Sequence, residues 1–100
     1  MPDKEDTQQF IDDKVKIINL IDELVERLED AVALGMNDEK SIIYNDLSLL
    51  KDDTDAADSY FILSEIVHHA KQIEQNIDTW LSSMGRVTGD LNWPDTTPEL

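Results

Sequence analysis

The first third of the chain carries a long helical pattern of apolar residues. Between positions 10 and 34 they recur at steps of three and four residues, so they share one side of a helix. Asp6 with Gln9 fits a capping pair, and Gly35 can adopt a left-handed stop, which predicts a helix from Asp6 to Leu34. The members of the stripe are Phe10, Ile17, Ile18, Leu20, Ile21, Leu24, Val25, Leu28, Ala31 and Val32.

A second, shorter helix of about four turns is predicted after Gly35. Asn37 and Asp38 are candidate N-caps, and Ile43, Leu47 and Leu50 follow at helical intervals. The run Asp52 to Asp55 is expected to break this helix, because Asp and Thr prefer caps and turns to helix interiors.

The strongest periodicity predicts a third helix that begins at this break and ends at Gly85. We therefore expect an all-α fold, a small bundle of two long helices and one shorter helix that is completed by dimerisation. Its stripe contains Ala56, Tyr60, Ile62, Leu63, Ile66, Val67, Ala70, Ile73, Ile77, Trp80, Leu81 and Met84.

The predicted domain division is an acidic helical bundle over residues 1–85 and a loop or tail over residues 86–100. The tail holds two of the three prolines, so it is not expected to be helical. It also holds Val87, Leu91 and Trp93, which leaves two interpretations open: the tail folds back over the bundle, or it binds a partner.

Charge and composition exclude several functions. The 100 residues carry 23 Asp and Glu against 8 Lys and Arg, a net charge of −15. Direct binding of nucleic acid or an anionic membrane needs a basic face, so a basic protein partner is expected instead. The chain has no Cys and three Gly, which excludes disulfides, thiolate sites and Gly-rich phosphate loops. With no apolar run of membrane-spanning length and an acidic, polar start over residues 1–9, a soluble cytoplasmic protein is predicted.

Two patterns of potential metal ligands occur in the sequence. Counted from Asp53 as a calcium loop, Asp58 stands where Gly makes the turn and Ser64 where the bidentate Glu belongs. Glu65 and His68 form one half of a di-iron motif, which requires two halves. A homodimer could supply the second half, but Glu65 lies opposite the apolar stripe, so the pair is expected to point towards solvent. We therefore predict no metal and no cofactor, and interpret the acids as helix caps and the histidines as surface residues.

A third acidic pattern resembles a family of enzymes. The step Asp22 to Glu26 and the later step Asp55 to Asp58 resemble the magnesium-binding acids of MazG-type nucleotide pyrophosphohydrolases, which are all-α proteins. This resemblance implies a magnesium-dependent nucleotide pyrophosphohydrolase. We keep that activity as the alternative to a protein without enzymatic activity.

The main hypothesis is a non-enzymatic binding protein, because residues 22–58 concentrate twelve acids and only three bases. Two versions remain open: an inhibitor that occupies the nucleic-acid cleft of its target as a DNA mimic, and an adaptor or chaperone. The nearly uncharged outer side of the third helix is expected to pack against a second copy in a homodimer. The predicted partner-binding residues are Asp12, Glu23, Glu26, Asp30, Asp52, Asp53, Asp55, Phe61 and Trp93.

Overall fold

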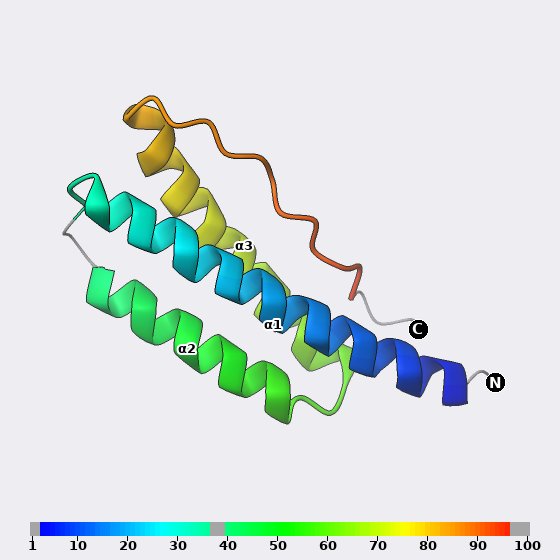
Figure 1. Ribbon diagram of the computed structural model, residues 1–100. Coiled ribbons are helices and arrows are strands. Elements are labelled where there is room, and N and C mark those ends of the chain that lie inside the picture. Colours follow the sequence, from blue (N-terminus) through cyan, green and yellow to red (C-terminus); the bar gives the residue numbers. More distant parts are fainter. Residues whose placement is uncertain (1–2, 37–39, 97–100) are drawn as a thin grey trace.

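A computed structural model describes residues 3–36 and 40–96 and shows a bundle of three helices (Figure 1). They are α1 (Asp3–Ala33), α2 (Lys40–Ala56) and α3 (Tyr60–Ser83), and the described residues contain no strand. The all-α prediction and the pattern of two long helices and one shorter helix are confirmed. The molecule is a rod with extents of 50 × 23 × 19 Å.

Each helix contacts the other two around one hydrophobic core. The predicted stripes supply nearly all of it, and Ile17, Leu24 and Ile77 are completely buried. Phe10, Trp80 and Trp93 pack against its edges. Ile62 and Met84, which the periodicity placed in the third stripe, are exposed instead.

The predicted helix break at residues 52–55 is wrong, because α2 continues through these acids to Ala56. Thr54 is fully buried, and its Oγ1 donates a hydrogen bond of 2.7 Å to the carbonyl of Leu50 within the same helix. Lys14 of α1 then donates from Nζ to the carbonyl oxygens of Asp55 and Ala57, at 2.8 and 3.0 Å. A cation from another helix thus satisfies carbonyl groups that a helix C-terminus leaves unpaired.

The helix ends differ in how well the sequence predicts them. Asp6 lies inside α1, which already includes Asp3, so it does not mark the start of that helix. Gly35 has φ +115° and Gly85 has φ +83°, which confirms both as stops. The candidate caps Asn37 and Asp38 lie outside the described residues. Helix α3 begins only at Tyr60, where the Ser59 side chain accepts a hydrogen bond from the Ile62 backbone N–H.

Residues 86–96 contain no helix and run back along the bundle toward the end that holds the N-terminus (Figure 1). Leu91 and Trp93 pack against the core, whereas Val87 is 97% exposed. Of the two interpretations of the tail, the structure therefore shows the segment folded back. None of the helices in the described ranges has the length and apolar character needed to cross a membrane.

Candidate functional site

The outer side of α1 carries a row of acids that we call the acidic ridge: Asp12, Glu23, Glu26 and Asp30. Asp12, Glu23 and Glu26 are exposed, and Asp12 accepts a hydrogen bond of 3.0 Å from Gln8. Asp30 is half-buried and pairs with Arg86 of the tail at 2.7 Å. At 1.5 Å per residue, the acids from Glu23 to Asp30 lie roughly 4.5 and 6 Å apart along the axis.

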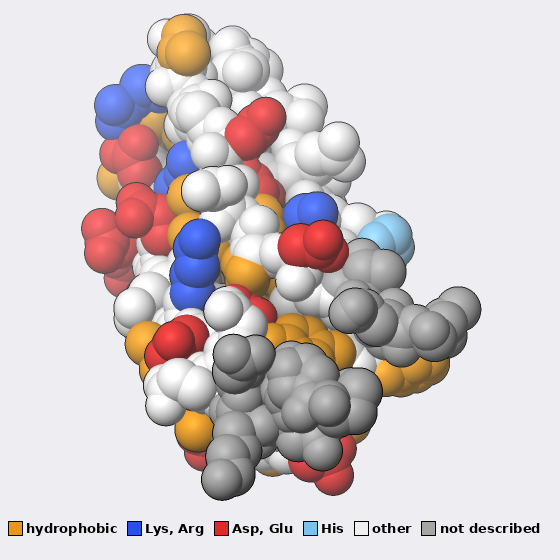
Figure 2. All heavy atoms as spheres, turned by 90° about the vertical axis from the view of Figure 1, so that its right-hand side faces the viewer, with side chains coloured by type: hydrophobic (Ala, Val, Ile, Leu, Met, Phe, Trp, Pro, Cys, Tyr) orange, Lys and Arg blue, Asp and Glu red, His pale blue; other side chains and the backbone are white. Residues whose placement is uncertain are grey.

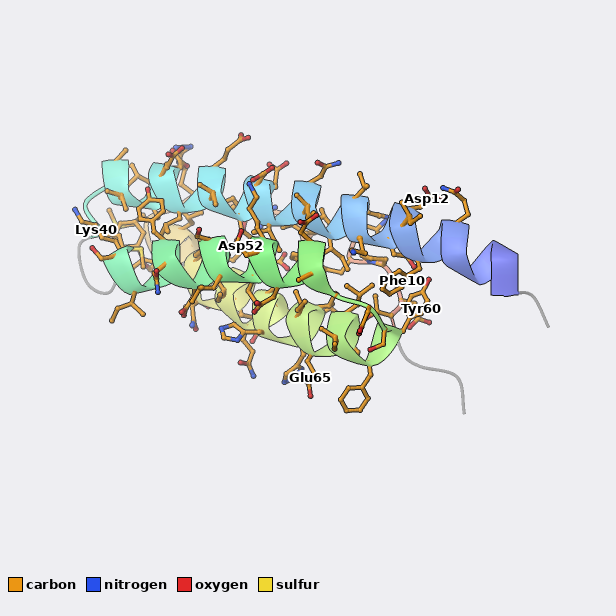
Figure 3. The ribbon with its side chains drawn as sticks, turned by 90° about the horizontal axis from the view of Figure 1, so that it is seen from below. Phe10, Asp12, Lys40, Asp52, Tyr60 and Glu65 are labelled. Atoms are coloured by element: carbon orange, nitrogen blue, oxygen red, sulfur yellow. The ribbon has the colours of Figure 1, made fainter. Side chains whose placement is uncertain are left out.

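The acids expected to extend the ridge come from α2 and are exposed, but they point in different directions. Asp55 is next to α1, because its carbonyl oxygen accepts from Lys14. Asp53 lines a hollow between α2 and α3 together with Glu65 and His69. Figure 3 shows Asp52 on α2 and Asp12 far along α1 toward its N-terminal end. The acids therefore cover more than one side of the rod.

Lys14, Lys51, Arg27 and Arg86 make contacts with other groups of the same chain. Lys14 caps α2, and Lys51 pairs with Asp22 at 2.6 Å. Arg27 and Arg86 contact Asp78 and Asp30. In Figure 2, acidic side chains gather along the left edge, where Lys and Arg side chains also lie. Glu23 and Glu26 are exposed on α1, as are Asp52, Asp53 and Asp55 on α2. Burial, and to a smaller extent the charge of Glu29, raises the pKa of Tyr44.

A second cluster, which we call the tail seat, holds residues 89–93 against α1 and α3. It consists of Arg27, Glu74 and Asp78. The buried Glu74 carboxylate accepts hydrogen bonds from the backbone N–H of Leu91 at 2.7 Å and from the Trp93 indole N–H at 2.8 Å.

Arg27 completes the tail seat from α1. Its guanidinium donates to Asp78 at 2.9 and 3.1 Å and to the carbonyl oxygen of Gly89 at 2.6 Å. The same group lies 3.7 Å from Glu74, so it compensates the buried negative charge. The tail seat therefore combines charge-assisted hydrogen bonds with apolar packing.

The tail seat was missed at the sequence level because Glu74 is an acid in a strongly acidic chain. Its position carried a signal, since Val67, Ala70, Glu74, Ile77 and Leu81 follow one another at steps of three and four residues. A charged residue in a buried stripe must be paired, which predicts a partner from elsewhere in the fold.

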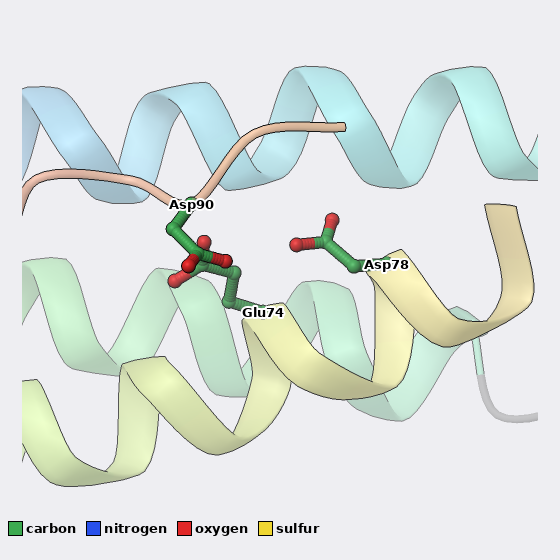
Figure 4. Close-up of side chains that lie close together, drawn as sticks. All are labelled: Glu74, Asp78 and Asp90. Atoms are coloured by element: carbon green, nitrogen blue, oxygen red, sulfur yellow. The ribbon is translucent and has the colours of Figure 1, made fainter. Parts of the chain in front are cut away.

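Glu74, Asp78 and Asp90 each bring a carboxylate oxygen within 4.8 Å of the others (Figure 4). Such oxygens suit a hard cation. Both oxygens of Glu74 already accept hydrogen bonds from the tail, and Asp78 is paired with Arg27. Among the side chains that the structure describes, this is the one group of three, and two of its three carboxylates already accept hydrogen bonds.

The acids that resemble the MazG-type pattern are not part of the group formed by Glu74, Asp78 and Asp90. Asp22 is paired with Lys51, while Glu23 and Glu26 face outward on α1. Asp55 and Asp58 are exposed at the far end of α2 and in the loop that follows. In the described part of the chain, these two steps do not form a set of three close ligands.

Glu65 and His68, which form one half of a di-iron motif in the sequence, lie on the surface of α3. Glu65 and His68 are exposed, and His68 contacts Gln72 at 3.3 Å. His69 lies 3.9 Å from Asp46 of α2. The histidines thus take part in surface contacts of α2 and α3.

The two aromatic candidates have different environments. Phe61 is 63% exposed near the start of α3, on the side that bears Ser64, Glu65 and His68. Trp93 is half-buried, packed on the core and bonded to Glu74. Two hollows of about 400 and 430 Å³ between α2 and α3 meet at His69, and exposed Ile42 and Ile62 contribute to their walls.

Comparison of this chain with protein-family models, with curated proteins and with solved structures finds no match.

Proposed function

We propose that this protein is a non-enzymatic binding protein that uses its acidic ridge to engage a basic macromolecular partner. The observation that carries the proposal is the distribution of charge. Arg27, Lys51 and Arg86 form ion pairs with acids of the same chain. Glu23 and Glu26, in contrast, remain exposed on a chain of net charge −15. Fixed surface charge of one sign attracts and orients a partner of the opposite sign.

Of the two versions, an inhibitor of a nucleic-acid-binding protein is favoured by the shape of the charged surface. The ridge runs along a helix in a rod 50 Å long and about half as wide. The acids from Glu23 to Asp30 form a short row on the rod, and such a row can enter a cleft that is lined with Lys and Arg for a phosphate backbone. An adaptor or chaperone for a basic partner is the second version, and it would use the same residues.

The proposal includes a homodimer formed through α2 and α3. The outer side of α3 offers Phe61, Ser64, Gln72 and Gln75, with few charges. Because two chains of charge −15 repel each other, a second copy packs most readily where the charge is lowest. Exposed Ile42 and Ile62 beside the hollows between α2 and α3 supply apolar area to this interface.

The test is a variant that neutralises the ridge: Glu23→Gln, Glu26→Gln and Asp30→Asn together. The immobilised parent should retain basic proteins from a lysate of its host at 0.15 M salt and release them at 0.5 M. Retention by the triple variant should fall at least tenfold, because contacts between charges weaken with screening. Helicity by circular dichroism should stay unchanged or rise, since like-charge repulsion on α1 is relieved and the Asp30–Arg86 pair that is lost is close to half exposed.

A matched control neutralises three exposed acids outside the ridge: Asp58→Asn, Glu65→Gln and Asp90→Asn. It should bind like the parent. Equal retention by the ridge variant and the parent would contradict the proposal and leave the charge with a role in solubility.

The MazG-like alternative is tested separately with a panel of nucleoside triphosphates and Mg²⁺. Release of pyrophosphate that disappears in Glu26→Gln would replace the binding proposal with an enzymatic one.

A further inference from the structure

The contacts that hold residues 89–93 against the helices are of the kind that proteins use to bind an extended peptide. The segment is not helical, and the hydrogen bonds that anchor it end on α1 and α3. The Gly89 carbonyl oxygen accepts from Arg27, and the Leu91 N–H and the Trp93 indole donate to Glu74. The apolar side chains of Leu91 and Trp93 pack on the core in the same stretch. Backbone hydrogen bonds with apolar pockets are how proteins recognise extended peptides.

The groove between α1 and α3 that contains the tail seat has polar groups placed to bind residues 89–93. Glu74 is only 6% exposed and directs one carboxylate oxygen at a backbone N–H and the other at an indole two residues later. A buried carboxylate without hydrogen bonds costs free energy. If residues 89–93 leave the groove, binding of any segment that restores both hydrogen bonds to Glu74 is therefore favourable. A Leu-x-Trp sequence supplies the two donors, the backbone N–H of its Leu and the indole N–H of its Trp.

The connection between α3 and the bound segment is weakly held. Gly85 turns the chain with φ +83°, and Val87 is almost completely exposed. Arg86 makes an ion pair with Asp30, in which both side chains are close to half exposed. Residues 84–88 can span about 16–18 Å when extended, so they can carry the segment away from its own bundle.

We propose that the groove between α1 and α3 is a recognition site for an extended Leu-x-Trp segment, and that the C-terminal segment of a second copy can occupy it. Two chains then exchange their segments about a two-fold axis. A second copy is the occupant because it carries the sequence that fits Arg27 and Glu74 here. The chain's own segment occupies the groove in dilute solution, since its effective concentration is high.

The site is tested with a fluorescein-labelled peptide of residues 85–96 and the full chain carrying Trp93→Ala, whose own segment has lost its indole anchor. Fluorescence anisotropy should show saturable binding. Affinity should fall at least tenfold for a peptide with the same Trp93→Ala change, and likewise when Glu74→Leu is added to the chain. Absence of saturable binding at 1 mM chain, or equal affinity of the altered peptide, would overturn the site.

Transfer of a segment to a second copy, one half of the exchange, is tested by mixing a Trp93→Ala chain, which keeps the tail seat, with a Glu74→Leu chain, which keeps the segment. Both chains carry Phe61→Glu, so that the dimer proposed through α2 and α3 does not contribute. In 0.5 M NaCl, which screens the repulsion between the chains, sedimentation should detect a heterodimer in the mixture and monomers in each separate sample. A mixture that stays monomeric at 0.5 mM would overturn the second copy as the occupant.

Discussion

Three polar side chains occupy positions that the helical periodicity assigns to the core: Asp13, Thr54 and Glu74. Asp13 and Glu74 are paired with elements distant in sequence, and Thr54 is paired within its own helix. Asp13 accepts from the Tyr60 hydroxyl at 2.9 Å and from Gln9, and Thr54 donates to Leu50. In the described part of the chain, every buried side-chain N or O atom has a hydrogen-bond partner. Asp13 and Glu74 therefore fix how the helices and the tail are arranged, because another arrangement would leave their carboxylates unpaired, whereas the Thr54 hydrogen bond stays within α2.

Lys14 is the residue whose loss should matter most at the junction of α1 and α2. Its ammonium group donates to the carbonyls of Asp55 and Ala57 and lies 5.4 Å from the centre of the Phe10 ring. The change Lys14→Ala should lower the free energy of unfolding by about 1–3 kcal/mol, because hydrogen bonds from a charged donor and a cation–π contact are lost. Urea denaturation followed by circular dichroism measures this.

Lys16→Ala is the matched control, since Lys16 is an exposed lysine of the same helix. It should change stability by less than ~0.5 kcal/mol. Equal effects of the two substitutions would show that the cap contributes nothing beyond the general charge of the chain.

At the scale of the elements, the structure shows helix ends that depend on single side chains. The first turn of α3 contains no acid, so its N-terminus relies on the Ser59 hydroxyl, which accepts from the Ile62 N–H at 3.3 Å. Ser59→Ala should therefore lower the free energy of unfolding by about 1 kcal/mol, the usual cost of losing an N-cap. Thermal and urea unfolding both report this change.

Two other substitutions distinguish a cap from a general effect of Ser. Ser59→Asp should keep the parent's stability or exceed it, because a carboxylate caps the same N–H and favours the positive end of the helix dipole. Ser48→Ala, at an exposed position inside α2, should be neutral or slightly stabilising. A loss in Ser48→Ala as large as in Ser59→Ala would contradict the cap.

At the scale of the whole molecule, charge limits where two chains can meet. The proposed homodimer uses the outer side of α3, and light scattering at tens of micromolar should then report about twice the chain mass of 11.4 kDa. Phe61→Glu should reduce the observed mass to that of one chain, because it places an unpaired charge at the centre of the interface.

Val87→Glu serves as the control, since Val87 is at least as exposed but lies on the tail. It should leave the dimer mass unchanged. A monodisperse monomer for the parent, or an equal response of the two variants, would contradict an interface around Phe61.

The sequence by itself determined the helical fold, because the apolar stripes are long and regular and burial follows local periodicity. Stops at Gly35 and Gly85 were equally predictable, since each requires a positive φ. The acidic surface of α1 also follows from the sequence, as Glu23 and Glu26 lie opposite the buried stripe.

Only the tertiary structure decided the contacts between segments far apart in the chain. Residues 52–55 remain helical, and Lys14, about forty positions earlier, donates to carbonyl oxygens at the end of α2. The tail folds back because Glu74 and Arg27, on different helices, converge on residues 89–93. The periodicity of apolar residues describes one helix at a time. A buried charge, in contrast, is stabilised by a group that lies beside it only after the three helices have packed together, so its partner cannot be read from the sequence of one helix.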